Sequence, residues 1–372
     1  MGKTFLATSE LLGTIMGAGF LAIPFVVAQS GFAIGLLHLI LIGSLITIVM
    51  LYLGEIVLRT KEYHQLPGYA EKYLGQQGKR WMSFAVLFGI STALLAYLIA
   101  EGESISVLLF GSPIQSLLSG IIFWALLSLL SLGGIRTLKK GESIGVILVF
   151  VMMISILVLF ASKINLTNLT TIHAEHLFTP FGIILFAFLA FTALPEVKLI
   201  LRNDKHLLKR SIIISHLLAF TLYVLFTLLV IGFKGTATPE IATFALGKPF
   251  ILLGMITMFT SYLSLSMSMM DTLHFDFKKT RSYAWIITIA IPIILYVLLN
   301  IFNQATFTTV LSVGGIISGG ITALLILAMV RRAKEHGNSS SPYSMPSNKI
   351  FLAILALIFI IGAITELISL LL

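Results

Sequence analysis

Cysteine is absent from this 372-residue chain, and charged residues make up only 10% of it. Without cysteine, the chain forms no disulfide, no Cys-ligated zinc or iron–sulfur site and no thiol nucleophile. Acidic residues number 15, whereas 58% of all residues are hydrophobic. A soluble globular domain cannot hide so much apolar surface from water, so the sequence predicts that a bilayer surrounds most of the chain.

Apolar runs long enough to cross a bilayer follow one another along the whole sequence. A spanning helix needs roughly 20 apolar residues. Hydropathy predicts eleven such helices, at Phe5–Ser30, Phe32–Leu58, Trp81–Phe110, Ile114–Gly134, Ile144–Ser162, Pro180–Leu201, Ser211–Phe233, Phe250–Phe275, Tyr283–Phe302, Phe307–Val330 and Ile350–Leu371. The first run lacks a small-residue cleavage site and continues into further spans, so we do not expect a removable signal peptide.

The basic residues predict the orientation of these helices. Cytoplasmic loops of membrane proteins retain Lys and Arg. With the N-terminus inside, only Lys163, Lys234 and Lys248 of the 24 Lys and Arg residues fall in outer loops. This pattern predicts an N-in, C-out topology, and it explains the net charge of +9 without a nucleic-acid partner.

The odd number of spans suggests an internal repeat. Five spans carry the chain from inside to outside, so a second set of five that begins at Pro180 would be the first set inverted. The predicted organisation is a first repeat (1–162), an outer loop (163–179), a second repeat (180–330), an inner linker (331–349) and a final helix (350–372). Ser and Pro are frequent from Glu335 to Asn348, which predicts a mobile linker.

Helix breakers lie inside the first span and the sixth. The first contains Gly13, Gly17, Gly19 and Pro24, and the sixth places Pro195 next to a carboxylate. Broken backbone is costly in hydrocarbon unless it lines protein or a water-filled cavity. Free N–H groups at half-helix ends suit a carboxylate, and free carbonyls suit a cation. The breaks therefore predict a pocket for a zwitterion and a coupling ion, although close packing at glycines is an alternative explanation.

Several motifs resemble known permeases. The run from Gly13 to Pro24 resembles the first-helix signature of the amino acid/auxin permeases and of the aromatic amino acid (tryptophan/tyrosine) permeases. Pro67–Gly75 resembles the loop helix of these permeases, and Leu94–Tyr97 resembles their third helix. Thr260–Ser264 resembles the eighth helix of the aromatic permeases, whereas Pro195–Val197 is more similar to the amino acid/auxin permeases. Both families belong to the amino acid–polyamine–cation superfamily. The resemblance implies an all-α integral membrane protein of the LeuT type, with a 5+5 inverted repeat and one C-terminal helix.

The resemblance also implies roles for individual residues. Backbone groups of Met16, Gly17, Ala18 and Gly19 would hold the substrate carboxylate, with Tyr97 as a further hydrogen-bond partner. The side-chain pocket would be formed by Phe188, Phe191 and Thr192. Packing between helices is the alternative role of the phenylalanines, and a place in an interfacial belt is the alternative for Tyr97.

The coupling ion is left open between Na⁺ and H⁺. In sodium-coupled relatives the ion lies between the first and eighth helices, which implies the carbonyls of Gly13, Met16 and Thr257 and the hydroxyls of Thr260 and Ser261. Oxygen ligands suit a hard cation, but Ser and Thr hydroxyls also bond to their own helix. The fifth span lacks the lysine of some proton-coupled relatives, which favours sodium or a carboxylate route. Glu196, which follows the break in the sixth span, is the candidate carboxylate for proton coupling.

Three other carboxylates receive individual predictions. Glu55 is expected to pair with Arg59, which lies one helical turn away. Glu101 and Glu103 are expected to reach the outer surface, where they would line the entrance.

Together these patterns predict a secondary active transporter that moves a neutral or aromatic amino acid across the cytoplasmic membrane by alternating access, with Na⁺ or H⁺ as coupling ion and no other cofactor. The expected partners are the amino acid and the lipid bilayer, and the oligomeric state stays open. The alternatives are an ion channel and a membrane-embedded enzyme. His173, Glu175 and His176 form the densest cluster of potential metal ligands, but their spacing differs from the HExxH zinc motif.

Overall fold

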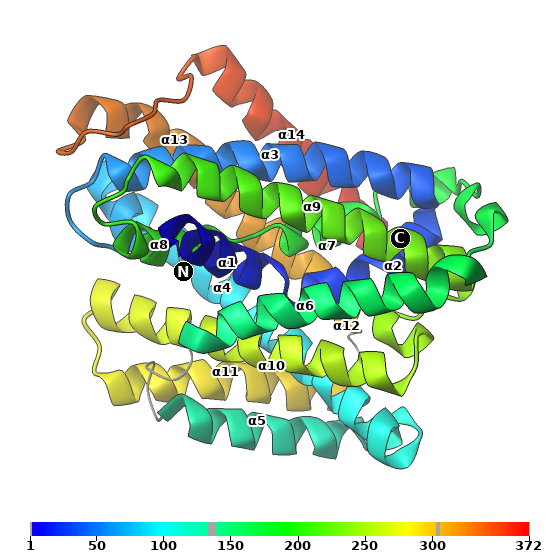
Figure 1. Cartoon of the computed structure of the whole chain (residues 1–372). Coiled ribbons are helices and arrows are strands. Elements are labelled where there is room, and N and C mark those ends of the chain that lie inside the picture. Colours follow the sequence, from blue (N-terminus) through cyan, green and yellow to red (C-terminus); the bar gives the residue numbers. More distant parts are fainter. Residues whose placement is uncertain (1, 133–138, 303–305, 372) are drawn as a thin grey trace.

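The computed structural model describes residues 2–132, 139–302 and 306–371, and its regular elements are helices that run roughly side by side (Figure 1). The α-helices are α1 (Lys3–Ile15), α2 (Ala18–Ser30), α3 (Phe32–Leu58), α4 (Leu66–Phe110), α5 (Ser116–Leu132), α6 (Lys139–Phe160), α7 (Pro180–Ala187), α8 (Leu194–Ile200), α9 (Leu207–Lys234), α10 (Lys248–Asp271), α11 (Arg281–Phe302), α12 (Phe307–Gly314), α13 (Gly320–His336) and α14 (Lys349–Leu371). The predicted end of the fourth span, Gly134, lies outside the described residues.

Ten helical segments of the described chain are long and apolar enough to cross a membrane, and the number is eleven if the bent pair of α1 and α2 counts as one span. The segments differ in how deeply they are packed. In the most apolar stretch of α4, 78% of the residues are buried, against 17% in α11 and 22% in α14. Because α11 and α14 expose apolar side chains such as Ile294 and Ile361, they lie where lipid can cover them, and α4 lies at the centre.

The first predicted span is broken in the middle. Helix α1 ends at Ile15 and α2 begins at Ala18, with a bend of 52° between them. The start of α2 approaches the end of α7 so closely that a Cβ atom at Gly19 would lie 2.6 Å from the Cα of Ala187. Glycine is therefore required at this position, since any side chain would push the two half-helices apart.

The sixth predicted span is broken as well. Helix α7 ends at Ala187, a short 3₁₀ turn covers Phe191–Ala193, and α8 begins at Leu194. Pro195 stands at the start of α8, where its missing N–H leaves no helical hydrogen bond unmade. The proline therefore marks the beginning of a new half-helix rather than a kink within a continuous one.

Helix α4 consists of a loop helix and the third span, which meet at a kink. Helix α4 starts at Leu66, and Gly75 joins its two parts with φ of 74°, a left-handed conformation that favours glycine. The first part corresponds to the loop helix that the motif at Pro67–Gly75 suggested. Its start is held by Asp276, whose carboxylate accepts the N–H of Gly68 at 3.0 Å.

The segment between α13 and α14 makes polar contacts with α3, and its predicted mobility stays a prediction. The Tyr343 hydroxyl donates to the carbonyl of Leu51 at 2.8 Å, and the N–H of Met345 donates to Glu55 at 2.7 Å. Glu55 also pairs with Arg59 at 2.8 Å, as predicted, and with Lys334 at 3.7 Å. The contacts of Tyr343 and Met345 join the segment to α3.

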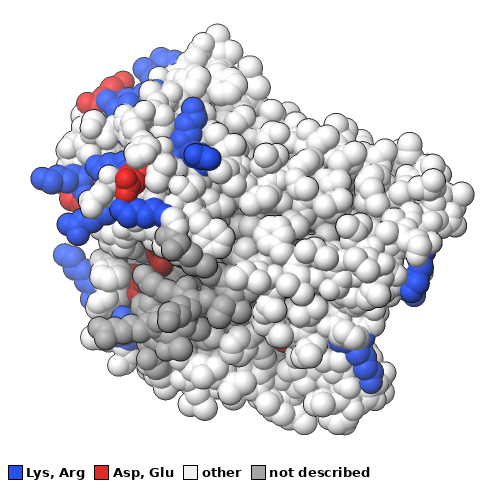
Figure 2. Space-filling view, in the orientation of Figure 1, with Lys and Arg blue, Asp and Glu red and all other residues white. Residues whose placement is uncertain are grey.

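Lys and Arg gather at one end of the molecule, and Figure 2 shows few of them at the opposite end. The basic end includes Arg59 at the end of α3 and Lys198 in α8, whose ammonium group donates to the carbonyl of Thr60 at 2.7 Å. The long helices therefore join a basic end to an end that carries little charge.

Candidate functional site

The two breaks lie next to each other and share one hydrogen-bond donor. The Tyr223 hydroxyl of α9 lies 2.8 Å from the carbonyl oxygen of Ile15, at the end of α1, and 2.8 Å from that of Ala187, at the end of α7. A hydroxyl carries a single proton, so it donates to one of these carbonyls at a time. Tyr223 is completely buried and thereby ties both broken helices to α9.

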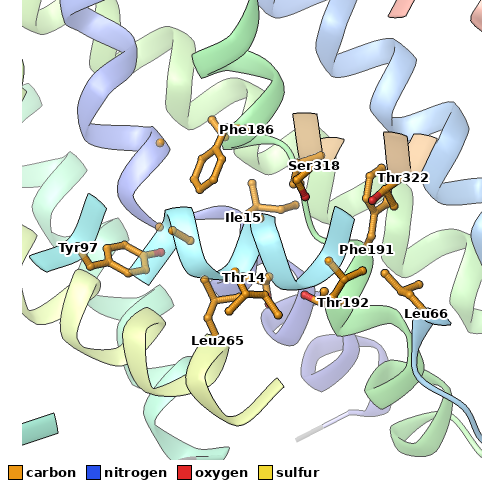
Figure 3. A pocket seen from close by; sticks show the side chains of 18 residues that line it. Thr14, Ile15, Leu66, Tyr97, Phe186, Phe191, Thr192, Leu265, Ser318 and Thr322 are labelled. Atoms are coloured by element: carbon orange, nitrogen blue, oxygen red, sulfur yellow. The ribbon is translucent and has the colours of Figure 1, made fainter. Parts of the chain in front are cut away.

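A cavity of about 70 Å³ opens beside the breaks (Figure 3). Five of the predicted substrate-binding residues line it: Gly17, Gly19, Tyr97, Phe191 and Thr192. Figure 3 shows Tyr97 at one end of the cavity and Leu66 at the other. Since Leu66 begins α4 beside the basic end, the cavity extends from the breaks toward that end.

Tyr97 closes the cavity on the side away from the basic end. Its hydroxyl accepts the N–H of Ala18 at 3.3 Å and also interacts with the Ser261 hydroxyl. A Cβ atom at Gly17 would lie 2.3 Å from this hydroxyl, so the contact depends on glycine. Tyr97 is 2% exposed, which excludes the interfacial-belt alternative.

Three predicted residues do not line the cavity. Met16 borders a second, smaller cavity, and Ala18 contributes its N–H to Tyr97. The Phe188 ring packs against Tyr223, with 5.1 Å between the ring centres, and the neighbouring Phe186 lines the cavity in its place. The backbone turn after Ala187 decides which phenylalanine faces the cavity, and the sequence does not show where that turn begins.

All five residues predicted for the coupling ion line the second cavity, which encloses about 20 Å³ between α1, α6 and α10: Gly13, Met16, Thr257, Thr260 and Ser261. A water-sized particle needs at least about 10–15 Å³, so the space fits one small ion or water. The Thr260 hydroxyl donates to the carbonyl of Thr257 at 2.9 Å, which is the bond within the same helix that was considered as an alternative.

The two carboxylate predictions near the site have different outcomes. Glu196 lies in the first turn of α8 and is half-buried, and it borders neither cavity. Its role in proton coupling stays a prediction. Glu101 was expected at the outer surface, but it is 0% exposed, so that prediction is wrong. The side chain is covered by the helices packed around α4.

Helices α12 and α13 add residues that the sequence did not single out. Ser318 and Thr322 line the main cavity from the π-helical turn Gly315–Gly319 and from α13. The glycine pairs at both ends of this turn were a usable signal, because π-helical turns are frequent at functional sites. Tyr223 had no such signal, since its partners are 208 and 36 residues away.

Two broken helices that meet at a buried cavity are typical of membrane permeases. Residues 1–243 match the tryptophan/tyrosine permease family, and the chain belongs to this family. The resemblance noted in the sequence is thereby confirmed, in favour of the aromatic amino acid permeases. The chain is a multi-pass permease of the cell membrane and not an enzyme.

Two relatives come from Haemophilus influenzae. The chain is similar to its tyrosine-specific transport system 1, with 26% identity over 236 residues, which cover 61% of this chain and 57% of that relative. It is also similar to its tyrosine-specific transport system 2, with 24% identity over 391 aligned positions, which cover 96% of this chain and 95% of the relative. The second match therefore spans nearly the full length of both chains.

Proposed function

We propose that this permease is a secondary active transporter of an aromatic amino acid, with tyrosine as the first candidate substrate. The observation that carries the proposal is the cavity at the meeting point of the two broken helices, closed on one side by Tyr97. The tyrosine-specific relatives support the choice of substrate. Transport would proceed by alternating access, in which the cavity opens to one side of the membrane at a time.

The chemistry of the cavity suits such a substrate. Helix α2 begins at Ala18 without a side-chain cap from Gly17, and the Ala18 N–H donates to the Tyr97 hydroxyl. The next N–H groups of the first turn, beginning with that of Gly19, would face the α-carboxylate. Phe186, Phe191 and Ile90 provide apolar walls for an aromatic ring. The hydroxyls of Thr192, Ser318 and Thr322 line the same space and could accept or donate a hydrogen bond to a phenol.

We further propose the LeuT-type arrangement, in which 1–162 and 180–330 are inverted repeats and 350–372 is an additional helix. The breaks in the first and sixth spans support this division. The basic end would face the cytoplasm, with the N-terminus inside and the C-terminus outside, and the gathering of Lys and Arg in Figure 2 supports that orientation. In this orientation the structure represents an inward-facing conformation, because the cavity extends toward the basic end.

Coupling to Na⁺ or H⁺ completes the proposal. The small cavity between α1, α6 and α10 offers oxygen atoms of Thr260 and Ser261 to a hard cation. Glu196 is the candidate proton carrier from the sequence. Uptake measured with a sodium gradient alone and with a pH gradient alone distinguishes coupling to Na⁺ from coupling to H⁺.

Uptake of radiolabelled amino acids into proteoliposomes tests the proposed function. We expect saturable uptake of L-tyrosine that an excess of unlabelled L-tyrosine inhibits, together with thermal stabilisation of the purified protein by an aromatic amino acid. Screening all twenty amino acids with and without sodium, at two pH values, identifies substrate and ion in one experiment. Failure of every amino acid to stabilise the protein would contradict the proposal, and a non-saturating ohmic current would indicate a channel.

A further inference from the structure

Glu101 is a buried carboxyl group without a partner. Its side chain is 0% exposed, and neither carboxylate oxygen has a hydrogen-bond partner among residues 2–132, 139–302 and 306–371. A buried, unpaired carboxylate anion is strongly unfavourable, so such a group is retained in neutral form or meets a cation. Ionisable residues within membrane spans commonly mark proton or ion pathways.

The position of Glu101 on α4 connects it with the main cavity. Five residues of α4 line the cavity: Val86, Gly89, Ile90, Ala93 and Tyr97. They recur at helical intervals, with Gly89 and Ile90 side by side, and so form one stripe on the helix. Glu101 continues this stripe one turn beyond Tyr97, about 6 Å farther along the axis. Ser104 follows it, and its buried hydroxyl also has no partner in the described part of the chain.

Tyr97 lies at one end of the cavity, and Glu101, one turn farther along the stripe, is not among the residues that line it. Glu101 therefore lies in the half of the transport pathway that is closed in this conformation, on the proposed outer side. When the opposite conformation opens that half, the stripe on α4 would become one wall of the outer pathway. Glu101 would then contact the outer solution, from which it is now sealed.

The surroundings of Glu101 supply no counter-charge. Helices α2, α5 and α12 carry no ionisable side chain in their described residues, and α13 and η9 (Thr272–Asp276) carry theirs at the basic end. The ionisable residues of the other two packed helices are Lys248, Tyr262 and Asp271 in α10 and Arg281, Tyr283 and Tyr296 in α11. In the described part of the chain, none of these six residues forms a hydrogen bond or an ion pair with Glu101. The same holds for Tyr97 and Glu103, which lie on α4 itself.

We propose that Glu101, in place of Glu196, binds the coupling proton of the transport cycle. This inference rests on the proposed amino acid transport. In the outward-open conformation the Glu101 carboxylate takes a proton from the outer solution, and the neutral carboxyl allows the pathway to close over it. The inward-facing conformation described here then holds the neutral carboxyl. The proton leaves toward the main cavity when water from that cavity passes the Tyr97 hydroxyl and solvates the carboxylate that remains.

The test compares exchange with accumulation of labelled L-tyrosine in proteoliposomes that contain the full chain. Coupling to one proton across a gradient of one pH unit supports about tenfold accumulation. For wild type we expect labelled L-tyrosine to accumulate about tenfold inside the proteoliposomes when the outer solution is one pH unit more acidic. Glu101→Gln, which imitates the neutral carboxyl, is expected to keep exchange between equal tyrosine pools and to lose the accumulation. Glu103→Gln, two residues away on a half-buried face of the same helix, is the matched control and should keep both.

Each outcome decides a different point. Full accumulation by Glu101→Gln would overturn the proton role, and so would a wild type driven by a sodium gradient but not by a pH gradient. Both results leave amino acid transport intact. If wild type shows no tyrosine exchange at all, the proposed function fails and the proton role fails with it.

A second measurement needs no variant and therefore does not depend on the folding of Glu101→Gln. Hydrophobic carbodiimides react with protonated carboxyl groups in membrane interiors. We expect mass spectrometry of the treated wild type to find the label on Glu101 and not on the ion-paired Glu55, with less label as the pH rises. An unlabelled Glu101 beside labelled carboxyls elsewhere would overturn the inference.

Discussion

Glu55 in α3 and Glu101 in α4 are shielded from solvent to the same degree, with exposures of 2% and 0%, but their surroundings differ. Glu55 pairs with Arg59 and Lys334 and accepts the N–H of Met345. Glu101 has no such partner in the described residues, and it lies on the stripe of α4 that lines the cavity. A paired buried carboxylate fastens segments of the chain together, whereas ionisable residues within membrane spans commonly mark proton or ion pathways.

This comparison separates a fastening region, around Glu55 and the segment between α13 and α14, from a transport region around the two breaks. Changes in the first region should lower stability with little effect on substrate affinity. Changes in the second should lower transport more than stability.

The largest effect is expected from Gly17→Val in the transport region. The new side chain would collide with the Tyr97 hydroxyl, which lies 2.3 Å from the Cβ position. We expect uptake of labelled tyrosine to be abolished while membrane insertion is unchanged. Gly320→Ala is the control, because its Cβ meets no atom within 4 Å. Normal uptake by Gly17→Val would refute a substrate site at the first break.

Glu55→Ala should have the largest effect in the fastening region. It leaves the N–H of Met345 without its acceptor and two cations without their partner, so we expect a loss of about 2–3 kcal/mol in the free energy of unfolding. Denaturant unfolding in detergent micelles measures the loss. The tyrosine affinity of the protein that remains folded should equal that of wild type, and a lowered affinity would contradict the division into two regions.

Tyr223→Phe tests the division between the two regions. Tyr223 lies at the two breaks, in the transport region, but its hydroxyl is hydrogen-bonded as the groups of the fastening region are. Removing its hydroxyl leaves a carbonyl at one of the breaks without a donor, which should cost about 1–2 kcal/mol of stability. We also expect uptake to fall, since the two half-helices lose their shared attachment to α9. A variant with lower stability and normal uptake would assign Tyr223 to the fastening role alone.

The smallest effect is expected from Tyr343→Phe, which removes one hydrogen bond to the carbonyl of Leu51. The loss should be about 1 kcal/mol in the free energy of unfolding, without change in uptake. Limited proteolysis should detect faster cleavage between α13 and α14. Cleavage as slow as in wild type would show that the other contacts of this segment hold it without Tyr343.

Much of the candidate site could be predicted because its signals are local. Glycines in the first span and Pro195 in the sixth mark where the helical hydrogen-bond pattern fails, and the structure breaks both spans there. The choice of Phe186 over Phe188 and the burial of Glu101 could not be predicted in this way. Both depend on the rotation and depth of a helix, which neighbouring helices set.

By itself, the sequence determined that a lipid bilayer surrounds most of the protein. It also determined where the apolar segments lie along the chain and where two of them break. Hydrophobicity and backbone chemistry act residue by residue, so they can be read along the chain. Only the tertiary structure decided which polar groups find partners. It placed the segment between α13 and α14 against Glu55 and joined two distant breaks through Tyr223. It also buried Glu101 without a hydrogen-bond partner among the described residues. Each of these results joins residues far apart in sequence or depends on how whole helices pack.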